Sequence, residues 1–164
     1  MYTKKQKVEI FFIFLLTVLA IELFTIFISE KRIFELFNTQ RENLPWAMPI
    51  WYMLLVWTGI FILIGASGSI IWTKRATHIR NFAMWAWVVQ LILNVLWPIC
   101  FFYVPIAVLT PILITLLFMT LLVLMFYSFL VSRLAALLIV PYFLMVVYKM
   151  LFHWVFYILN IKLL

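Results

Sequence analysis

Charged residues are scarce in this chain of 164 residues. Only 10% are charged, whereas 69% are hydrophobic, and soluble domains usually contain roughly 25% charged residues. A soluble fold with this composition would have to expose apolar side chains over most of its surface. The scarcity of charge therefore excludes a water-soluble fold and predicts an integral membrane protein whose outer surface faces lipid.

The residues that enzymes and metal sites need are also scarce. The chain has no aspartate, its five acids are all glutamates within the first 42 residues, and its single cysteine, Cys100, excludes an intramolecular disulfide. There is no glycine-rich phosphate loop, no HExxH motif and no paired-cysteine motif. We therefore predict that the protein is not an enzyme and has no catalytic residues, no metal and no cofactor. A membrane enzyme is the least supported functional class.

Five stretches of the chain are long and apolar enough to span a bilayer, which requires about 20 residues per helix. They cover residues 9–29, 49–72, 82–103, 107–131 and 136–159. The connections between them are too short to bury a core of their own. The sequence predicts an all-α integral membrane protein, with residues 1–164 forming one five-helix bundle. The longest connection, 30–48, is partly amphipathic and is placed to lie over one end of this bundle.

Basic residues between the spans predict the orientation, because they resist translocation. One side would hold seven of them and the other side four, the larger set being Lys4, Lys5, Lys7, Lys74, Arg75, Arg80 and Arg133. This bias predicts a multi-pass protein of a bacterial-type cell membrane with a cytoplasmic N-terminus. The net charge of +7 is explained by this bias and by contact with anionic lipids, so we predict no nucleic-acid partner.

The three glycines all lie in the second span, at Gly59, Gly65 and Gly68. Together with Ala66, Ser67 and Ser69 they form a run of small residues on which another helix backbone can approach closely. The run is interpreted as a packing face inside one bundle, with a seam between two copies of the chain as the alternative.

The eight tryptophans fall into two groups by position. Trp72, Trp85 and Trp87 lie at the inner ends of two spans, as interfacial anchors do. Outer positions on three different helices are occupied by Trp51, Trp57, Trp97 and Trp154, and Trp46 lies in the first loop above them. The outer group is interpreted either as a lipid-facing belt or as the lining of an aromatic cavity.

Polar side chains within the spans are costly and so require an explanation. They are Glu22, Gln90, Asn94, Lys149 and His153. The first, third and fifth spans run in the same direction, which places Glu22, Asn94 and Lys149 at nearly the same depth. A polar layer near the midplane is predicted, in which Glu22 and Lys149 share one layer directly or through water or ligand.

Each of these residues also has a simpler structural interpretation. Glu22 and Lys149 can form a neutralising pair, and the Gln90 and Asn94 amides can make interhelical hydrogen bonds. His153 as a haem-iron ligand is weakly supported, because one histidine without a second fixed ligand is a poor signal.

Three ordered segments resemble the TspO/MBR family, the translocator proteins also called peripheral-type benzodiazepine receptors. The second helix of that family is similar to Trp46-Ala47-Met48-Pro49, Val56-Trp57-Thr58 and Ile64-Gly65-Ala66. Its third helix is similar to the segment from Gln90-Leu91 through Asn94 and Trp97 to Phe101-Phe102. Its fifth helix is similar to the segment from Ala136 through Pro141-Tyr142 to Asn160.

The resemblance implies a five-helix bundle, often a homodimer, that binds porphyrins such as protoporphyrin and haem, sterols and aromatic drugs. The first loop of the family acts as a lid over the pocket. By position, the resemblance implies pocket roles for Trp46, Trp57, Asn94 and Trp97, with Gln90 supporting the third helix.

The chain also departs from the family pattern. The first loop lacks the family's lysine, and Trp87 stands where the family has tyrosine. The tryptophan that usually follows Pro-Tyr is Met145, which argues against light-driven porphyrin degradation. Lys149 replaces a small residue, and His153 replaces the usual asparagine.

Two functions from different classes follow from these observations. The leading hypothesis is a membrane-embedded sensor or carrier for a flat, partly anionic hydrophobic ligand such as a porphyrin, with Lys149, His153 and Trp154 at the site. The alternative is a small proton-coupled multidrug-type transporter that uses Glu22, an intramembrane carboxylate.

The predicted orientation can be tested by placing a single cysteine in the first loop. Because residues 30–48 are expected on the outer side, Thr39→Cys should react with a membrane-impermeant thiol reagent added to intact cells. Labelling that requires permeabilised cells would reverse the orientation without changing the fold.

Overall fold

Five long helices make up nearly all of the chain that the structure describes. The structure is a computed structural model that describes the backbone of residues 2–43, 50–104, 106 and 108–161, and the side chains of these except 30–43, 50, 53, 156 and 159–161. The helices are α1 (Lys4–Asn43), α2 (Ile50–Thr73), α3 (His78–Tyr103), α4 (Leu109–Val131) and α5 (Arg133–Ile161). Each contains a stretch long and apolar enough to cross a membrane. The predicted class, an all-helical membrane protein with five spanning helices, is confirmed.

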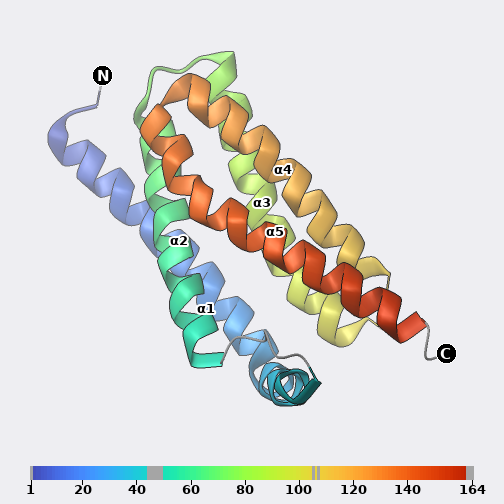
Figure 1. The fold of residues 1–164 in the computed structure, drawn as a ribbon. Coiled ribbons are helices and arrows are strands. Elements are labelled where there is room, and N and C mark those ends of the chain that lie inside the picture. The colour runs from blue at the N-terminus through green and yellow to red at the C-terminus, as the bar shows by residue number, and fades with distance from the viewer. Residues whose placement is uncertain (1, 44–49, 105, 107, 162–164) are drawn as a thin grey trace.

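Short connections set the direction of the helices. Ser132 alone joins α4 to α5, and its backbone is extended. Its N–H group donates a hydrogen bond of 2.7 Å to the Ser128 carbonyl oxygen at the end of α4. Thr77 caps α3, because its side chain accepts a hydrogen bond of 3.2 Å from the Arg80 N–H. Helices joined this closely must be antiparallel neighbours. As a result, α1, α3 and α5 run in one direction and α2 and α4 in the other (Figure 1).

The helix neighbours define an interior between α2, α3 and α5. Helix α1 packs against α2 and α3, α4 packs against α3 and α5, and α2 packs against α5. In the described part of the chain, α3 and α5 are not among the closely packed helix pairs. Large side chains therefore fill the space between α3 and α5.

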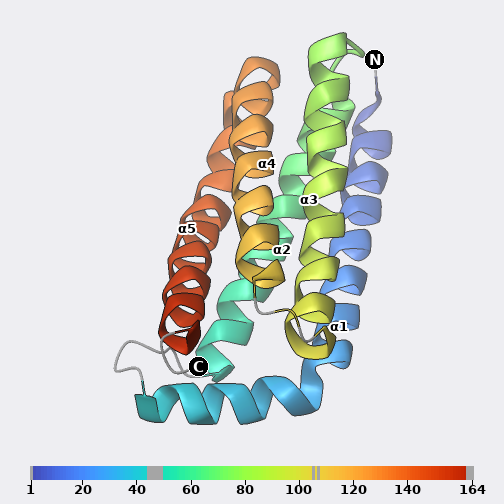
Figure 2. The same ribbon diagram turned by 90° about the vertical axis from the view of Figure 1, so that its right-hand side faces the viewer.

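Helix α1 continues beyond its membrane-spanning part. The spanning segment is Lys4–Ser29, but residues 30–43 remain helical and run across the end of the bundle (Figure 2). Three hydroxyl groups donate to α1 carbonyls near this change of direction: Thr25 to Glu22 and Ser29 to Thr25, both at 2.7 Å, and Tyr103 to Ile28 at 2.8 Å. Side-chain bonds of this kind favour helix bending. The predicted position of the first loop over one end is thus observed for the 30–43 backbone.

The small residues of α2 form a packing face within the bundle. A Cβ atom added to Gly65 would lie 2.9 Å from the Val18 side chain of α1. One added to Gly68 would lie 2.5 Å from the Trp87 ring and 2.7 Å from that of Phe14. The interpretation of Gly65 and Gly68 as an internal packing face is confirmed, and α1 and α3 occupy the space that a second copy would need.

Trp87 differs from the sequence expectation. Its side chain is 5% exposed, packs against Phe14 with ring centroids 4.9 Å apart, and donates a hydrogen bond of 3.0 Å to the Ile64 carbonyl oxygen. Trp85, in contrast, is 69% exposed. The prediction that Trp87 is an interfacial anchor was wrong, because the missing side chain at Gly68 leaves room for its indole inside the bundle.

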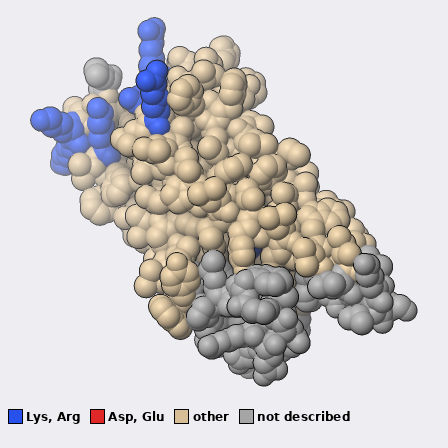
Figure 3. Space-filling model, viewed as in Figure 1, with Lys and Arg blue, Asp and Glu red and all other residues tan. Residues whose placement is uncertain are grey.

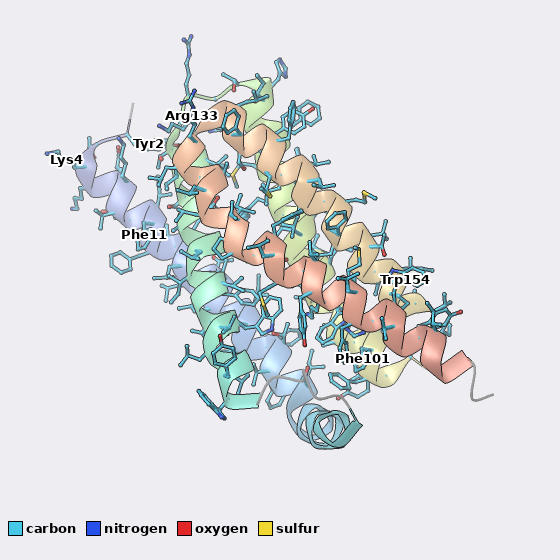
Figure 4. The ribbon with its side chains drawn as sticks, viewed as in Figure 1. Tyr2, Lys4, Phe11, Phe101, Arg133 and Trp154 are labelled. Carbon is cyan, nitrogen blue, oxygen red and sulfur yellow. The ribbon has the colours of Figure 1, made fainter. Side chains whose placement is uncertain are left out.

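Basic side chains gather at one end of the molecule. Figure 3 shows Lys and Arg at the end where the chain begins, and Figure 4 places Lys4 and Arg133 there. The start of α1, the α2–α3 connection and the α4–α5 connection meet at this end (Figure 1). The seven basic residues predicted to share one side thus come from segments that lie at the same end of the bundle.

The glycine packing predicts opposite effects at two positions in α2. Gly68→Ala should lower the free energy of unfolding by about 1–3 kcal/mol, because the new methyl group overlaps Trp87 and Phe14. Gly59→Ala is the matched control, since nothing lies within 4 Å of its Cβ position and alanine is the better helix former. Thermal unfolding of the purified variants in detergent measures the change in stability at each of the two positions. Equal losses at the two positions would contradict the packing face.

Candidate functional site

Side chains from α3 and α5 meet in a column inside the bundle. On α3 the column contains Gln90, Asn94 and Trp97, and on α5 it contains Tyr142, Lys149 and His153. These positions are three, four or seven residues apart within each helix, which places them on one face. The two helices run in the same direction, so the column has the same order on both: Asn94 meets Tyr142, and Trp97 meets Lys149 and His153.

The inner part of the column is a network of amide and phenol groups. The Asn94 side-chain NH₂ group donates to the Gln90 carbonyl oxygen at 2.9 Å, to Gln90 Oε1 at 3.0 Å and to the Tyr142 hydroxyl. Gln90 and Tyr142 are fully buried, and Gln90 Nε2 has no hydrogen-bond partner in the described part of the chain. Asn94 therefore bridges α3 and α5, as the hydrogen-bond interpretation predicted, whereas the bonds of Gln90 to Asn94 stay within α3 and are not interhelical. Gln90 supports it from within α3.

Tyr142 is a site residue that the sequence reasoning did not select. It was part of the Pro-Tyr motif, but no role was assigned to it. Its ring lies edge-on to Trp57 with centroids 6.3 Å apart, so it also connects the amide network to α2.

Lys149 lies between two indole rings in the outer part of the column. Its Nζ atom is 3.5 Å from the Trp97 ring centroid and 4.5 Å from that of Trp57. Both distances are within the range of cation–π attraction. Trp57, Trp97, Lys149 and His153 are hereafter called the indole–lysine cluster, which brings together α2, α3 and α5.

His153 is held by the indole of Trp97. His153 Nε2 lies 3.1 Å from Trp97 Nε1, and the residue is 4% exposed. Because an indole N–H can only donate, His153 Nε2 must accept, which assigns a neutral imidazole with its proton on Nδ1. The nitrogen that would bind an iron is thus already engaged. No group of three or more His, Cys, Asp or Glu residues suited to a metal ion occurs among the described side chains.

Glu22 is held by α2. The residue is 5% exposed, and its Oε1 atom accepts a hydrogen bond of 2.7 Å from the Thr58 hydroxyl. Among the described side chains the salt bridge is Lys5 to Glu9 at 4.0 Å, so Glu22 and Lys149 are not directly paired. The structure thus does not show the direct form of the predicted shared layer, and sharing through water or ligand stays a prediction.

The reason is the direction of neighbouring side chains on α2. Consecutive helical residues point about 100° apart. Thr58 therefore reaches Glu22 on α1, while Trp57 reaches Lys149 on α5. Glu22 and Lys149 were predicted at equal depth, but equal depth does not require that they contact the same face of α2.

Trp154, another tryptophan of the predicted site, lies apart from the cluster. Trp154 is 36% exposed and donates a hydrogen bond of 3.1 Å to the Thr115 hydroxyl of α4. Figure 4 shows it on the α4 side of α5, away from Phe101. The structure does not bring Trp154, which was predicted at the ligand site, together with Trp57 and Trp97, since it follows His153 directly and faces α4. Trp51 is 66% exposed, and Trp46 lies outside the described residues.

The fold and this cluster define a multi-pass integral membrane protein with aromatic and polar side chains at its centre. A model of the TspO/MBR family matches residues 12–159. The chain therefore belongs to the TspO/MBR family, as its motifs indicated. A comparison with curated proteins gives no match.

The separation of Glu22 from Lys149 can be tested by two double-mutant cycles on thermal stability. Glu22→Leu combined with Thr58→Val should show a coupling of about 0.6–1.7 kcal/mol, the range measured for hydrogen bonds within membranes. Glu22→Leu combined with Lys149→Met should be additive in the absence of ligand. Coupling in the second cycle as large as in the first would restore the direct pair.

Proposed function

We propose that the protein is a membrane-embedded sensor or carrier that binds flat, hydrophobic aromatic ligands such as porphyrins at the indole–lysine cluster. Membership of the TspO/MBR family supports this proposal, because the family is known for binding porphyrins, sterols and synthetic aromatic drugs. In this proposal residues 1–164 form one transmembrane domain with a cytoplasmic N-terminus, and the site has neither a catalytic residue nor a cofactor.

The observation that carries the proposal is that Trp57 and Trp97, both half-buried, contact the same lysine side chain. The two indoles come from different helices, α2 and α3, and both face the side chain of Lys149 from α5. Aromatic faces give affinity for a planar ligand, and a small number of polar groups fix its orientation. Lys149, His153 and the Asn94–Tyr142 network are the polar groups that lie against these indoles.

The first loop is placed to cover this part of the bundle. The backbone of residues 30–43 crosses the end opposite to the one where Lys4 and Arg133 lie (Figures 2 and 4). Trp97, His153 and Phe101 lie in the last parts of α3 and α5, which point towards that end. We propose that a ligand reaches the cluster past this segment.

A proton-coupled transporter is the alternative, and the observation in its favour is the buried carboxyl group of Glu22. Among the described side chains this group bonds to Thr58, and its environment differs from that of the indole–lysine cluster. The two functions differ in what Glu22→Gln should do. A transporter would lose proton-driven efflux, whereas a binding protein in detergent would keep its affinity for ligand.

Ligand binding is tested by titrating the detergent-purified protein with protoporphyrin and following the quenching of tryptophan fluorescence. Trp97→Leu and Trp57→Leu should each raise the dissociation constant about tenfold, because each removes one aromatic face from the site. The dissociation constant is compared, since the quenching amplitude changes with the number of tryptophans.

Trp85→Leu is the matched control. Trp85 is on the same helix as Trp97 but is 69% exposed and lies in the first part of α3. Its replacement should leave the dissociation constant unchanged. If all three variants bind like the native protein, the site lies elsewhere.

A further inference from the structure

The ammonium group of Lys149 has no anionic partner in the part of the chain that the structure describes. Its closest recorded contacts are the faces of Trp97 and Trp57. Among the described side chains, no carboxylate lies within 4.0 Å of it. A cation inside a membrane protein normally faces an acid or backbone carbonyl groups. Lys149 is therefore a cation that the described protein groups leave uncompensated.

The polar groups around Lys149 do not supply the missing charge. The Glu22 carboxyl accepts from Thr58, whereas Lys149 lies against Trp57, the preceding residue, which points about 100° away on α2. His153 is neutral, because its Nε2 atom accepts the Trp97 N–H. Asn94 and Tyr142 carry no charge and bond to each other. All the groups described around the ammonium are thus neutral.

The two indole faces compensate Lys149 only in part. A cation–π contact is weaker than a hydrogen-bonded ion pair in a water-poor interior, where the charge is poorly solvated. The interaction is also non-specific, since it fixes neither a hydrogen-bond direction nor a single position of the ammonium. An anion brought in by a ligand would gain both the charge attraction and the hydrogen bonds that Lys149 can donate.

We propose that Lys149 binds the carboxylate of an aromatic ligand held between Trp57 and Trp97, so that the site selects acidic ligands over their neutral esters. This inference rests on the proposed function and adds to it the chemical class of the ligand. The family resemblance does not supply it, because lysine replaces a small residue at this position.

The geometry also gives Lys149 a role against neutral ligands. Its ammonium lies 3.5 Å from the Trp97 centroid and so occupies the ring face on which a ligand would stack. An acidic ligand draws the ammonium towards its carboxylate and leaves that face open. A neutral ligand of the same shape has to displace the ammonium without replacing the interaction that it loses. Selectivity then follows from competition for one indole face.

The test compares two ligands that share one ring system. Protoporphyrin carries two carboxylates, whereas its dimethyl ester has none. The detergent-purified native protein should bind the free acid at least about tenfold more tightly than the ester, as expected for one charge-assisted hydrogen bond. Lys149→Met should remove most of this preference by weakening binding of the acid, and Lys149→Arg should retain the preference because it keeps the cation.

Lys74→Met is the control for general charge effects, since Lys74 is an exposed cation in the α2–α3 connection. It should leave the ratio of the two dissociation constants unchanged. The comparison of acid and ester on the native protein needs no variant, so a misfolded Lys149→Met does not prevent the test. If neither ligand binds, the proposed function fails. If both bind equally, or Lys149→Met keeps the preference, the role of Lys149 is overturned while the binding function stands.

Discussion

Two helices that run in the same direction, α3 and α5, meet through their large side chains, and this contact organises the centre of the bundle. The Asn94–Tyr142 hydrogen bond joins them at one level, and the Trp97–His153 hydrogen bond joins them at another. A shorter side chain at any of these positions would leave a gap or let the helices approach. The positions of Lys149 and Trp57 depend on this spacing, because both fill the space that it leaves.

Lipid makes these specific contacts important. Apolar helices gain little from burying apolar surface against one another in a hydrocarbon solvent, so close packing and hydrogen bonds decide which faces meet. In this chain, Gly65 and Gly68 let α1 and α3 approach α2. The Trp87 and Ser67 side chains then donate to backbone carbonyls of neighbouring helices, at 3.0 and 2.9 Å. The bundle is thus fixed on the side of α1, while the space between α2, α3 and α5 is filled by aromatic and cationic groups.

The two charged side chains within the spans have different surroundings. Glu22 has a hydroxyl partner across the α1–α2 contact and is explained by the fold. The cation–π partners of Lys149 among the described side chains are Trp57 and Trp97. The first residue has a hydrogen-bond partner within the protein, whereas the second is the one for which we propose a ligand carboxylate as partner.

The sequence by itself determined the class, the five spans and the family, because length and hydrophobicity decide whether a helix can cross a bilayer. It also predicted that Glu22 and Lys149 lie at a similar level along the bundle, since rise per residue follows from position in a helix, and the two contact consecutive residues of α2, Thr58 and Trp57. Only the tertiary structure decided which way each side chain faces. Glu22 and Lys149 matched in depth but lie on different sides of α2, Trp154 faces α4, and Trp87 is buried over Gly68. The rotation of each helix about its own axis depends on packing against all of its neighbours at once. A helix that is apolar on every side has little hydrophobic periodicity from which this rotation could be predicted.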